Sequence, residues 1–424
     1  IGSSMVTSIY ILADTIMVGQ GVGDAGLAAL TIFMPIVASF FALGLLLGIG
    51  GGVLMSVAKG SGNESLAHKY FSTAMISAAV VSVCFAVFGA IFFDPMMYAL
   101  GADTTNIELV RGYGLCYTVS APLFIFSSSL QSFIRNDKSP RHAMIAVLTG
   151  SGLNILLDYL FIFVFKMGMF GASFATSIGT SITVCILIIH FFTKKNTMRF
   201  SFRFFSIKAL WEIAKCGFSS FLIECANAVL VFVFNHTLLK YIGSVGVTVY
   251  SIMSNVAVVC MSLFNGVTLA AQPIIATNHG ADNHKRVLQV RHIGTITSSV
   301  IAVIIFCVGF FFPDLLIYSY VKGPTPEILE LARYALRIYF FAYLFMNFNI
   351  FFSGYFQSTL RPVAAITIQI LRSLLLSSVL VSVLPMIFGA DAIWYAVPIT
   401  ECITFFVAMA FLFFGRFKKT KDAK

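Results

Sequence analysis

Charged residues are scarce in this 424-residue chain. Asp, Glu, Lys and Arg together make up 10% of it, whereas a soluble globular protein carries roughly 25%. Hydrophobic residues make up 59%, and the mean hydropathy is +0.94. This composition excludes an ordinary soluble domain and is typical of repeated apolar runs, each of about 20 residues, that cross a bilayer. The sequence therefore predicts an all-α integral membrane protein.

The chain also lacks the patterns of metal, disulfide and phosphate-binding sites. Its eight cysteines lie almost entirely inside apolar runs without a Cys-x-x-Cys pair, so neither a zinc site nor a disulfide framework is predicted. No His-Glu-x-x-His segment or P-loop is present, which disfavours an integral-membrane enzyme. Nothing resembles the repeated selectivity filter of a channel. We expect no enzyme activity and no cofactor.

The net charge of +10 does not indicate a nucleic-acid partner, because Lys and Arg fall in short segments between apolar runs. Those runs predict twelve membrane spans, and the chain begins inside the first one, whose start we expect to be trimmed. The predicted spans are 1–19, 27–58, 70–97, 107–134, 141–165, 171–193, 211–240, 247–278, 287–318, 327–356, 361–387 and 390–415.

Lys and Arg divide unevenly between the two sets of alternate loops. Nineteen of the 27 lie in one set, five lie in the other, and Lys215, Arg337 and Arg372 lie within the spans or at their edges. Since cytoplasmic loops of membrane proteins carry the excess of Lys and Arg, both termini are predicted to be cytoplasmic.

The two halves of the chain look like copies offset by about 218–221 residues. The segment 92–95 (FFDP) matches 311–314 (FFPD), and 170–173 (FGAS) matches 388–391 (FGAD). Six spans separate the copies, so both halves share one orientation, as in parallel repeats of secondary transporters. The predicted organisation is an N-lobe at 1–193, a cytoplasmic linker at 194–210, a C-lobe at 211–415 and a basic cytoplasmic tail at 416–424.

Three glycines indicate where another helix packs against the second predicted span. Gly44, Gly48 and Gly52 recur at every fourth position of the second span. Such a ladder lets the backbones of two membrane helices approach closely. We therefore expect another helix to pack against this face.

Four polar residues of the N-lobe are predicted to meet. Asp14 and Asp158 lie five and seven residues before the outer ends of their spans, and Thr176 lies five residues into the next, at similar depth. Asn154 precedes Asp158 by four residues and shares its helix face. Because ionisable groups inside a membrane are costly, this oxygen-rich set is predicted to hold a proton or a small cation. The alternative is that each Asp merely joins neighbouring helices.

The C-lobe does not repeat this acidic set. Applying the offset aligns Asn154 with Arg372 and Asp158 with Leu376, whereas Glu224, Arg372 and Glu401 fall near the middle of their own spans. One interpretation is an internal ion network that neutralises Arg372. The other is a role in substrate binding or gating, to which Asn347 of the aromatic tenth span is added.

Several segments together resemble the multidrug and toxic compound extrusion (MATE) family. The segment 13–19 (ADTIMVG) is similar to the family's first-helix motif, and 154–158 (NILLD) to its fifth. The segment 171–176 (GASFAT) is similar to the start of its sixth helix. The segments 271–275 (AQPII) and 278–281 (NHGA) are similar to the end of its eighth. The resemblance covers essentially the whole chain.

The resemblance implies twelve helices in two six-helix lobes that form a V around a central cavity. It also implies export of organic cations or other amphiphiles in exchange for H⁺ or Na⁺, by a monomer in the bacterial cell membrane. Asp14, Asn154, Asp158 and Thr176 match the N-lobe cation site of one branch, and Glu224 matches an acidic residue of another. An Asp that the second branch has in span 10 is absent here. A lipid-intermediate flippase of the same superfamily stays open as the alternative, although it needs a basic cavity.

Overall fold

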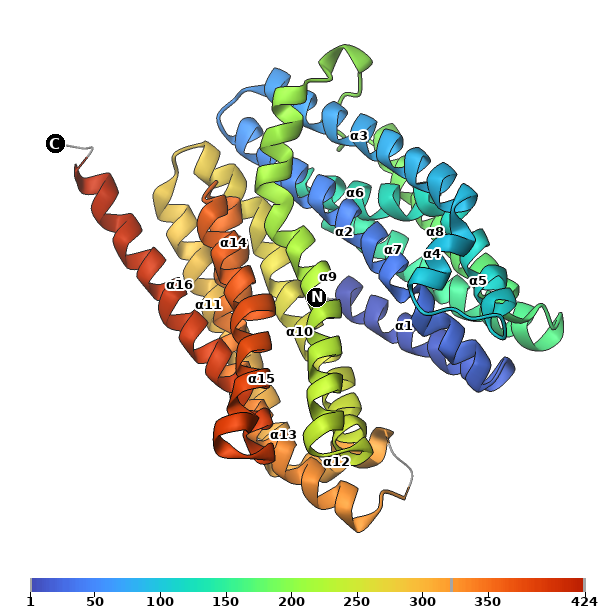
Figure 1. The fold of residues 1–424 in the computed structure, drawn as a ribbon. Coiled ribbons are helices and arrows are strands. Elements are labelled where there is room, and N and C mark those ends of the chain that lie inside the picture. Colours follow the sequence, from blue (N-terminus) through green and yellow to red (C-terminus); the bar gives the residue numbers. More distant parts are fainter. Residues whose placement is uncertain (1, 321–322, 422–424) are drawn as a thin grey trace. The chain divides into compact units, whose positions relative to one another are not determined.

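The computed structural model describes residues 2–320 and 323–421 and is almost wholly helical, with no β-strand among these residues (Figure 1). The last three residues of the predicted basic tail lie outside the described part. In the first half the helices are α1 (Gly2–Gly21), α2 (Asp24–Gly60), α3 (Glu64–Ile91), α4 (Phe93–Ala99), α5 (Ile107–Val119), α6 (Ala121–Asn136), α7 (Pro140–Asp158), η1 (Tyr159–Val164), α8 (Gly168–Ile189), η2 (His190–Phe192) and η3 (Phe202–Phe204). In the second half they are α9 (Ile207–Tyr241), α10 (Ser244–Gly280), α11 (His284–Phe311), α12 (Pro313–Tyr320), α13 (Pro326–Ser358), α14 (Pro362–Ile370), η4 (Leu371–Leu375), α15 (Leu376–Phe388), η5 (Ala390–Tyr395) and α16 (Ala396–Lys421).

The predicted all-α membrane architecture is confirmed. Within the described residues, ten helices are long and apolar enough to cross a membrane, and an eleventh span results when α5 and α6 are counted together. The shorter α1 corresponds to the remaining predicted span. The fourth predicted span is not one straight helix, because α5 and α6 meet at an angle of 51°. Pro122 lies in the first turn of α6, where it cannot donate the backbone hydrogen bond that would continue α5.

The internal repeat is visible in the helix boundaries. The helices α2 and α10 are both 37 residues long and begin 220 positions apart, and α3 and α11 are both 28 residues long with the same offset. Asn63 and Asn283 cap α3 and α11 in the same way, each accepting a hydrogen bond from the backbone three residues later. Equal lengths and equal caps at a constant offset support the two-copy organisation.

A surface ion pair is repeated as well. Arg111 donates from Nε and Nη2 to the two carboxylate oxygens of Asp94, at 3.2 and 2.5 Å. Arg333 does the same to Asp314, at 2.5 and 2.7 Å. In each half the pair joins the short helix after the third span (α4 or α12) to the start of the fourth. The matched segments 92–95 and 311–314 therefore contribute the same local contact.

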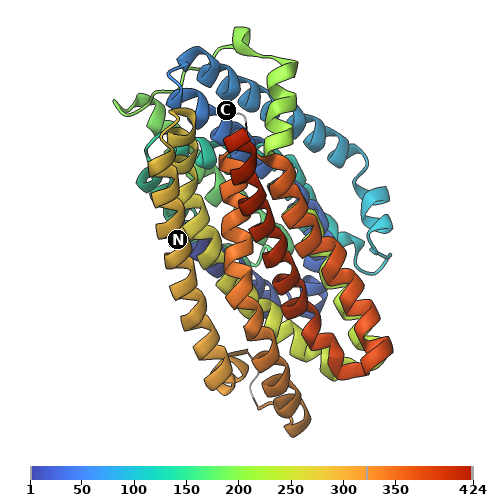
Figure 2. The ribbon, with the colours of Figure 1, turned by 90° about the vertical axis from the view of Figure 1, so that its left-hand side faces the viewer.

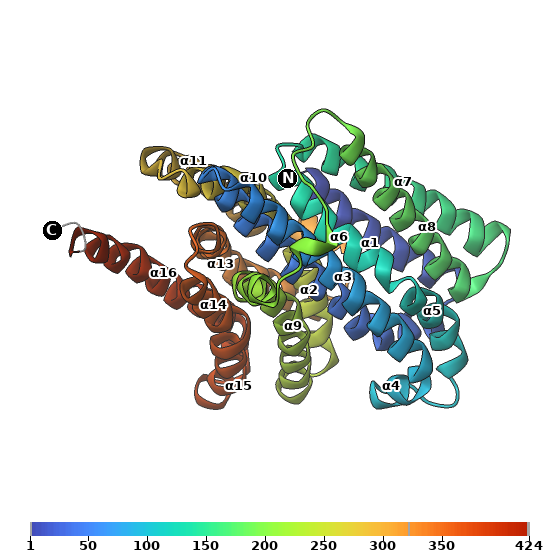
Figure 3. The same ribbon diagram turned by 90° about the horizontal axis from the view of Figure 1, so that it is seen from above.

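The described residues form two compact units. The N-terminal unit comprises Gly2–Glu224 and Ala276–Asp282, and the C-terminal unit comprises Cys225–Ile275 and Asn283–Lys424. The change of unit falls inside α9, after Glu224, whereas the sequence marks 194–210 as the linker; the predicted lobe boundaries stay a prediction. In the N-terminal unit α1, α7 and α8 lie side by side (Figure 3). In the C-terminal unit α14 and α15 run alongside α16, the orange to dark red helices of Figure 2.

The predicted glycine contact of the second span is present. A Cβ atom on Gly44 would lie 2.7 Å from Ser128 Cβ, and one on Gly48 would lie 2.7 Å from Ser129 Cα. One on Gly52 would lie 2.8 Å from Asn136 Nδ2. All three obstacles belong to α6, so the absence of side chains on this face of α2 allows the two backbones to touch.

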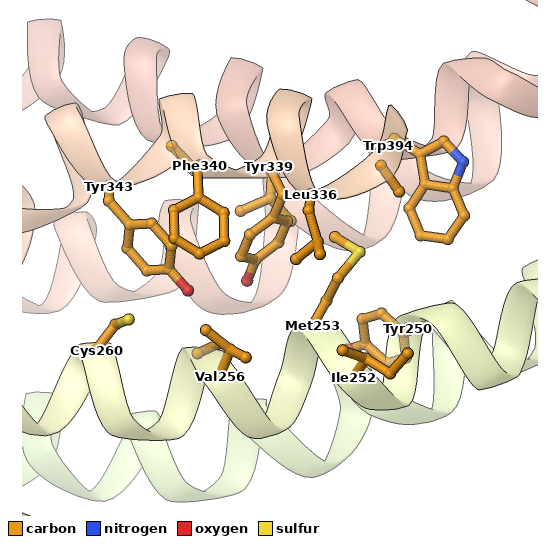
Figure 4. Close-up of a cluster of buried hydrophobic side chains, with 14 of the residues drawn as sticks. Tyr250, Ile252, Met253, Val256, Cys260, Leu336, Tyr339, Phe340, Tyr343 and Trp394 are labelled. Carbon is orange, nitrogen blue, oxygen red and sulfur yellow. The ribbon is translucent and has the colours of Figure 1, made fainter. Parts of the chain in front are cut away.

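Aromatic residues of the tenth span form the core of the C-terminal unit. Leu336, Tyr339, Phe340 and Tyr343 lie on one face of α13, at the spacing that a helix repeats, and contact α10 (Figure 4). The rings of Phe340 and Tyr343 are 5.0 Å apart in an edge-to-face arrangement. These side chains are buried, so this part of the aromatic run packs against its own unit.

Candidate functional site

The four polar residues predicted to meet in the N-terminal half lie on three helices that contact one another. Asp14 lies in α1, Asn154 and Asp158 lie in the last turns of α7, and Thr176 lies in α8. Asn154, Asp158 and Thr176 are buried. Asn154 Nδ2 donates to Thr176 Oγ1 over 3.3 Å, and the carboxyl groups of Asp14 and Asp158 are close neighbours. The structure thus brings the predicted set together.

Two glycines explain why α7 and α8 come close enough at this point. A Cβ atom on Gly150 would lie 2.6 Å from the carbonyl oxygen of Gly179, and one on Gly179 would lie 2.8 Å from the carbonyl oxygen of Gly150. The crossing is therefore set by backbone contact. Asn154 lies one turn beyond Gly150, and Thr176 lies about one turn before Gly179, so both side chains are held beside the crossing.

The regular α-helix α7 ends at Asp158. The next six residues, Tyr159–Val164, form a π-helical segment. Single π-helical turns inside membrane helices are uncommon and often mark functional sites, because the extra residue shifts the helix face. The fifth helix of the second half has a similar interruption at Leu371–Leu375. There it carries Arg372.

The site is rich in oxygen atoms that have no hydrogen-bond partner. Four of the buried acceptors without a partner belong to this site: Asp14 Oδ1, Asn154 Oδ1 and both carboxylate oxygens of Asp158. Buried acceptors without donors are rare, since each carries a desolvation cost of about 1–3 kcal/mol or more. The desolvation cost is larger for two neighbouring carboxyl groups, because both cannot be charged in a dry site without a positive ion. The geometry fits a bound proton or a small cation.

Three tyrosines near the aspartates were not part of the predicted site. Tyr10 and Tyr113 lie within electrostatic range of both carboxyl groups, and Tyr117 lies within range of Asp14. The rings of Tyr113 and Tyr117 stack on each other, 5.6 Å apart. Tyr10 precedes Asp14 by four residues and shares its helix face, so the sequence alone indicates that these two are neighbours. The other two come from α5, a helix that no polar pattern connects to this site.

In the C-terminal unit, Arg372 and Glu401 form a buried ion pair. Arg372 Nε lies 2.6 Å from Glu401 Oε1, and both side chains are at most 5% exposed. Asn349 Nδ2 donates to Glu401 Oε2 over 2.7 Å. Asn347 instead accepts a hydrogen bond from Ser298, at 3.2 Å, since residues two apart on α13 face different sides of the helix. Glu224 belongs to the other compact unit.

Among the residues that the structure describes, no group of three or more His, Cys, Asp or Glu side chains is arranged to hold a metal ion.

Comparison with known proteins decides the family. The MatE family model matches residues 1–160 and 216–383, which is more than half of the chain. The chain belongs to the MatE family. The resemblance found in the sequence motifs is thereby confirmed.

The relatives of this MatE protein span nearly its full length. It is 26% identical over 421 residues to the multidrug export protein MepA of Staphylococcus haemolyticus, covering 99% of this chain and 92% of MepA. It is 27% identical over 423 residues to MepA of Staphylococcus saprophyticus, with the same coverage. The names of both relatives describe transporters rather than enzymes.

Solved structures show the same fold. An outward-facing multidrug resistance MATE family transporter of the MOP superfamily superposes with a TM-score of 0.91 at 21% identity, covering 99% of this chain and 94% of that chain. A MATE crystal structure in the bent conformation superposes with a TM-score of 0.89 at 22% identity, covering 100% and 95%. At this level of identity the likeness establishes the fold of a multi-pass membrane transporter family.

Proposed function

We propose that this MatE protein is a secondary active transporter that exports several kinds of small organic molecule across the cell membrane. Its relatives are named multidrug export proteins and match it from end to end. The expected substrates are lipophilic organic cations and other amphiphiles. A monomer with both termini in the cytoplasm is part of the proposal.

We infer that Asp14 and Asp158 couple export to the entry of a cation. The single observation that carries this inference is the carboxyl pair, three of whose buried oxygens have no hydrogen-bond partner. A proton would neutralise one carboxylate and let it donate to the other. A sodium ion would instead be bound by the carboxylate oxygens, with the Asn154 amide oxygen and the Thr176 hydroxyl nearby. Either ion supplies the positive charge that the site lacks.

Coupling follows if the two conformations of the transporter bind the ion with different affinity. A ligand shifts a conformational equilibrium only by its difference in affinity for the two states. We propose that the outward-facing state takes up the ion at the aspartate pair and releases the substrate. The inward-facing state then releases the ion and rebinds substrate, as in other alternating-access transporters.

The test is efflux of a fluorescent organic cation from proteoliposomes under an imposed pH gradient or an imposed sodium gradient. Asp14→Asn and Asp158→Asn keep the side-chain shape and remove the charge, so we expect both to reduce gradient-driven efflux to the level of empty liposomes. Asp94→Asn is the matched control, because that aspartate is bonded to Arg111 on the surface. Wild-type efflux from either site variant would refute the assignment, and the gradient that drives the wild type identifies the ion.

The flippase alternative receives no support from Arg372, the buried arginine of the C-terminal unit. A pyrophosphate headgroup requires unpaired positive charge in the substrate cavity. The buried Arg372 is already paired with Glu401. We therefore keep export of organic molecules as the proposed function.

A further inference from the structure

A basic cavity of about 550 Å³ lies at one end of the N-terminal unit, away from the aspartate pair. The loop before α7 and the first turn of that helix form one wall, and the end of α8 with η2 and the following residues forms the other. The lining residues are Lys138, Ser139, Pro140, Arg141, His142, His190, Thr193, Lys194 and Lys195. No acidic side chain lines the cavity.

The positive charge of the cavity is not neutralised within the described residues. Lys138, Arg141, Lys194 and Lys195 make no ion pair there. The adjacent carboxylate, Asp137, is 1% exposed and already accepts hydrogen bonds. Its donors are Lys59 Nζ, His190 Nε2 at 2.9 Å, Thr197 Oγ1 and the backbone N–H of Thr197 at 3.0 Å. The lining therefore presents four basic side chains without an ion-pair partner, and the nearest carboxylate is already occupied by other donors.

A buried hydroxyl group in the same cavity lacks a partner. Ser139 is 7% exposed, and its Oγ has no hydrogen-bond partner although it lines the cavity. Ser139 is the N-cap residue of α7, but its side chain makes no capping hydrogen bond. Its hydroxyl is thus free to donate to a bound anion, at a helix end whose partial positive charge favours one. His142 Nε2 donates to the carbonyl oxygen of Ile186 over 2.7 Å, which ties α7 to α8 beside the cavity.

The second half of the internal repeat has the same backbone conformation at the position equivalent to Ser139, but a different side chain. Lys138 and Leu360 have the same left-handed backbone, with φ of 60° and 54°, and Pro140 and Pro362 begin the following helices. Between them the second half carries Arg361 in place of Ser139. The Arg361 guanidinium donates to the carbonyl oxygen of Phe411 over 3.1 Å, so this side chain has a hydrogen-bond partner within its own unit. The corresponding Ser139 hydroxyl has no such partner.

We propose that the cavity binds the phosphate group of an anionic phospholipid. Phosphate is the anion that lysine, arginine, a serine hydroxyl and a helix N-terminus bind together. A lipid is favoured over a soluble phosphate because exposed apolar residues continue from the cavity wall along α8 and η2. Ile189 is 54% exposed and Phe192 is 85% exposed, which leaves an apolar surface beside the charges for acyl chains. Basic cavities between helices on the cytoplasmic side of membrane proteins recognise such headgroups.

The experiment titrates the purified full chain, in a non-ionic detergent, with phosphatidylglycerol, with phosphatidylcholine and with inorganic phosphate. Each attracted Lys or Arg contributes on the order of 1 kcal/mol, or about fivefold in affinity. We expect Arg141→Gln/Lys195→Gln to weaken phosphatidylglycerol binding about 25-fold. Lys285→Gln/Arg286→Gln, an exposed pair at the start of α11, is the charge-matched control and should bind like the wild type.

A second variant keeps the test independent of net charge. Ser139→Ala removes only the partnerless hydroxyl, so we expect the unfolding temperature to stay unchanged and the affinity to fall about two- to tenfold. Equal losses in the cavity and control variants would overturn the proposal in favour of diffuse attraction. Equal binding of phosphatidylcholine would overturn the role of charge. If inorganic phosphate binds as tightly as phosphatidylglycerol, the bound phosphate group does not need to belong to a lipid, and the proposal of a lipid ligand is overturned.

Discussion

The buried pair of Arg372 and Glu401 offers a quantitative test of the C-terminal unit. The two side chains are 5% and 3% exposed, and Glu401 also accepts from Asn349. Removing one partner of a buried pair leaves an uncompensated charge in a dry interior, which costs about 3–5 kcal/mol. We expect Arg372→Met and Glu401→Gln each to lower the free energy of unfolding by that amount.

The double variant should cost less than either single one. Arg372→Met/Glu401→Gln removes both charges at once, and the glutamine oxygen can still accept from Asn349. Replacing a whole buried pair by neutral groups of similar volume is often close to neutral. We therefore expect a coupling energy of about 3 kcal/mol or more between the two positions.

Denaturant unfolding of the purified variants in one detergent, monitored by tryptophan fluorescence and circular dichroism, measures these free energies. Strictly additive losses would refute the reasoning, because they would mean that the pair is not formed in the folded protein. The same double variant separates two roles that the sequence left open. Normal efflux in liposomes would assign the pair to structure, and lost efflux from a folded variant would assign it to substrate binding or gating.

Two further changes test the packing beside the candidate site and the buried carboxylate of Asp137. Gly150→Ala should destabilise the protein by about 1–3 kcal/mol or more, because its Cβ would lie 1.8 Å from Thr183 Oγ1, whereas Gly152→Ala, with nothing within 4 Å, should be neutral or stabilising in the same unfolding assay. Burial opposes the charged form of Asp137, but hydrogen bonds from Lys59, Thr197 and His190 outweigh it and lower its pKa. Asp137→Asn should therefore be less stable than the wild type at pH 7, by on the order of 2 kcal/mol. The gap in thermal unfolding should begin to narrow as the pH falls below about 4 and keep narrowing down to the lowered pKa of Asp137; a gap that stays constant from about pH 5 to about pH 2 would contradict the ionic explanation.

Much of the architecture followed from patterns that are local in the chain. Apolar runs longer than a bilayer is thick can only be buried as membrane helices, so the spans were predictable from composition and length. The repeat was visible in matched short segments, and the structure shows it as equal helix lengths at an offset of 220. The bend between α5 and α6 was missed, although Pro122 was there to indicate it.

The candidate site was predictable because its chemistry is exceptional for its surroundings. Asp14 and Asp158 stand out in apolar spans, and helix rise places them at the same depth with Thr176. Tyr113 and Tyr117 were not predictable, because tyrosine is common in membrane helices and nothing local says which face of α5 turns toward α1. The same reason hid Asn349, whose contact with Glu401 depends on how α13 is rotated.

Residue order along the chain thus determined which segments enter the membrane, how often the pattern repeats and which few polar groups stand inside it. It did not determine helix rotation or crossing, which come from side chains far apart in sequence fitting against one another. The partnerless oxygens near Asp158, the self-satisfied Arg361 and the open cavity at Ser139 all arise at that level. Hydrophobicity acts on each segment separately, whereas close packing and hydrogen bonding act only between segments already brought together.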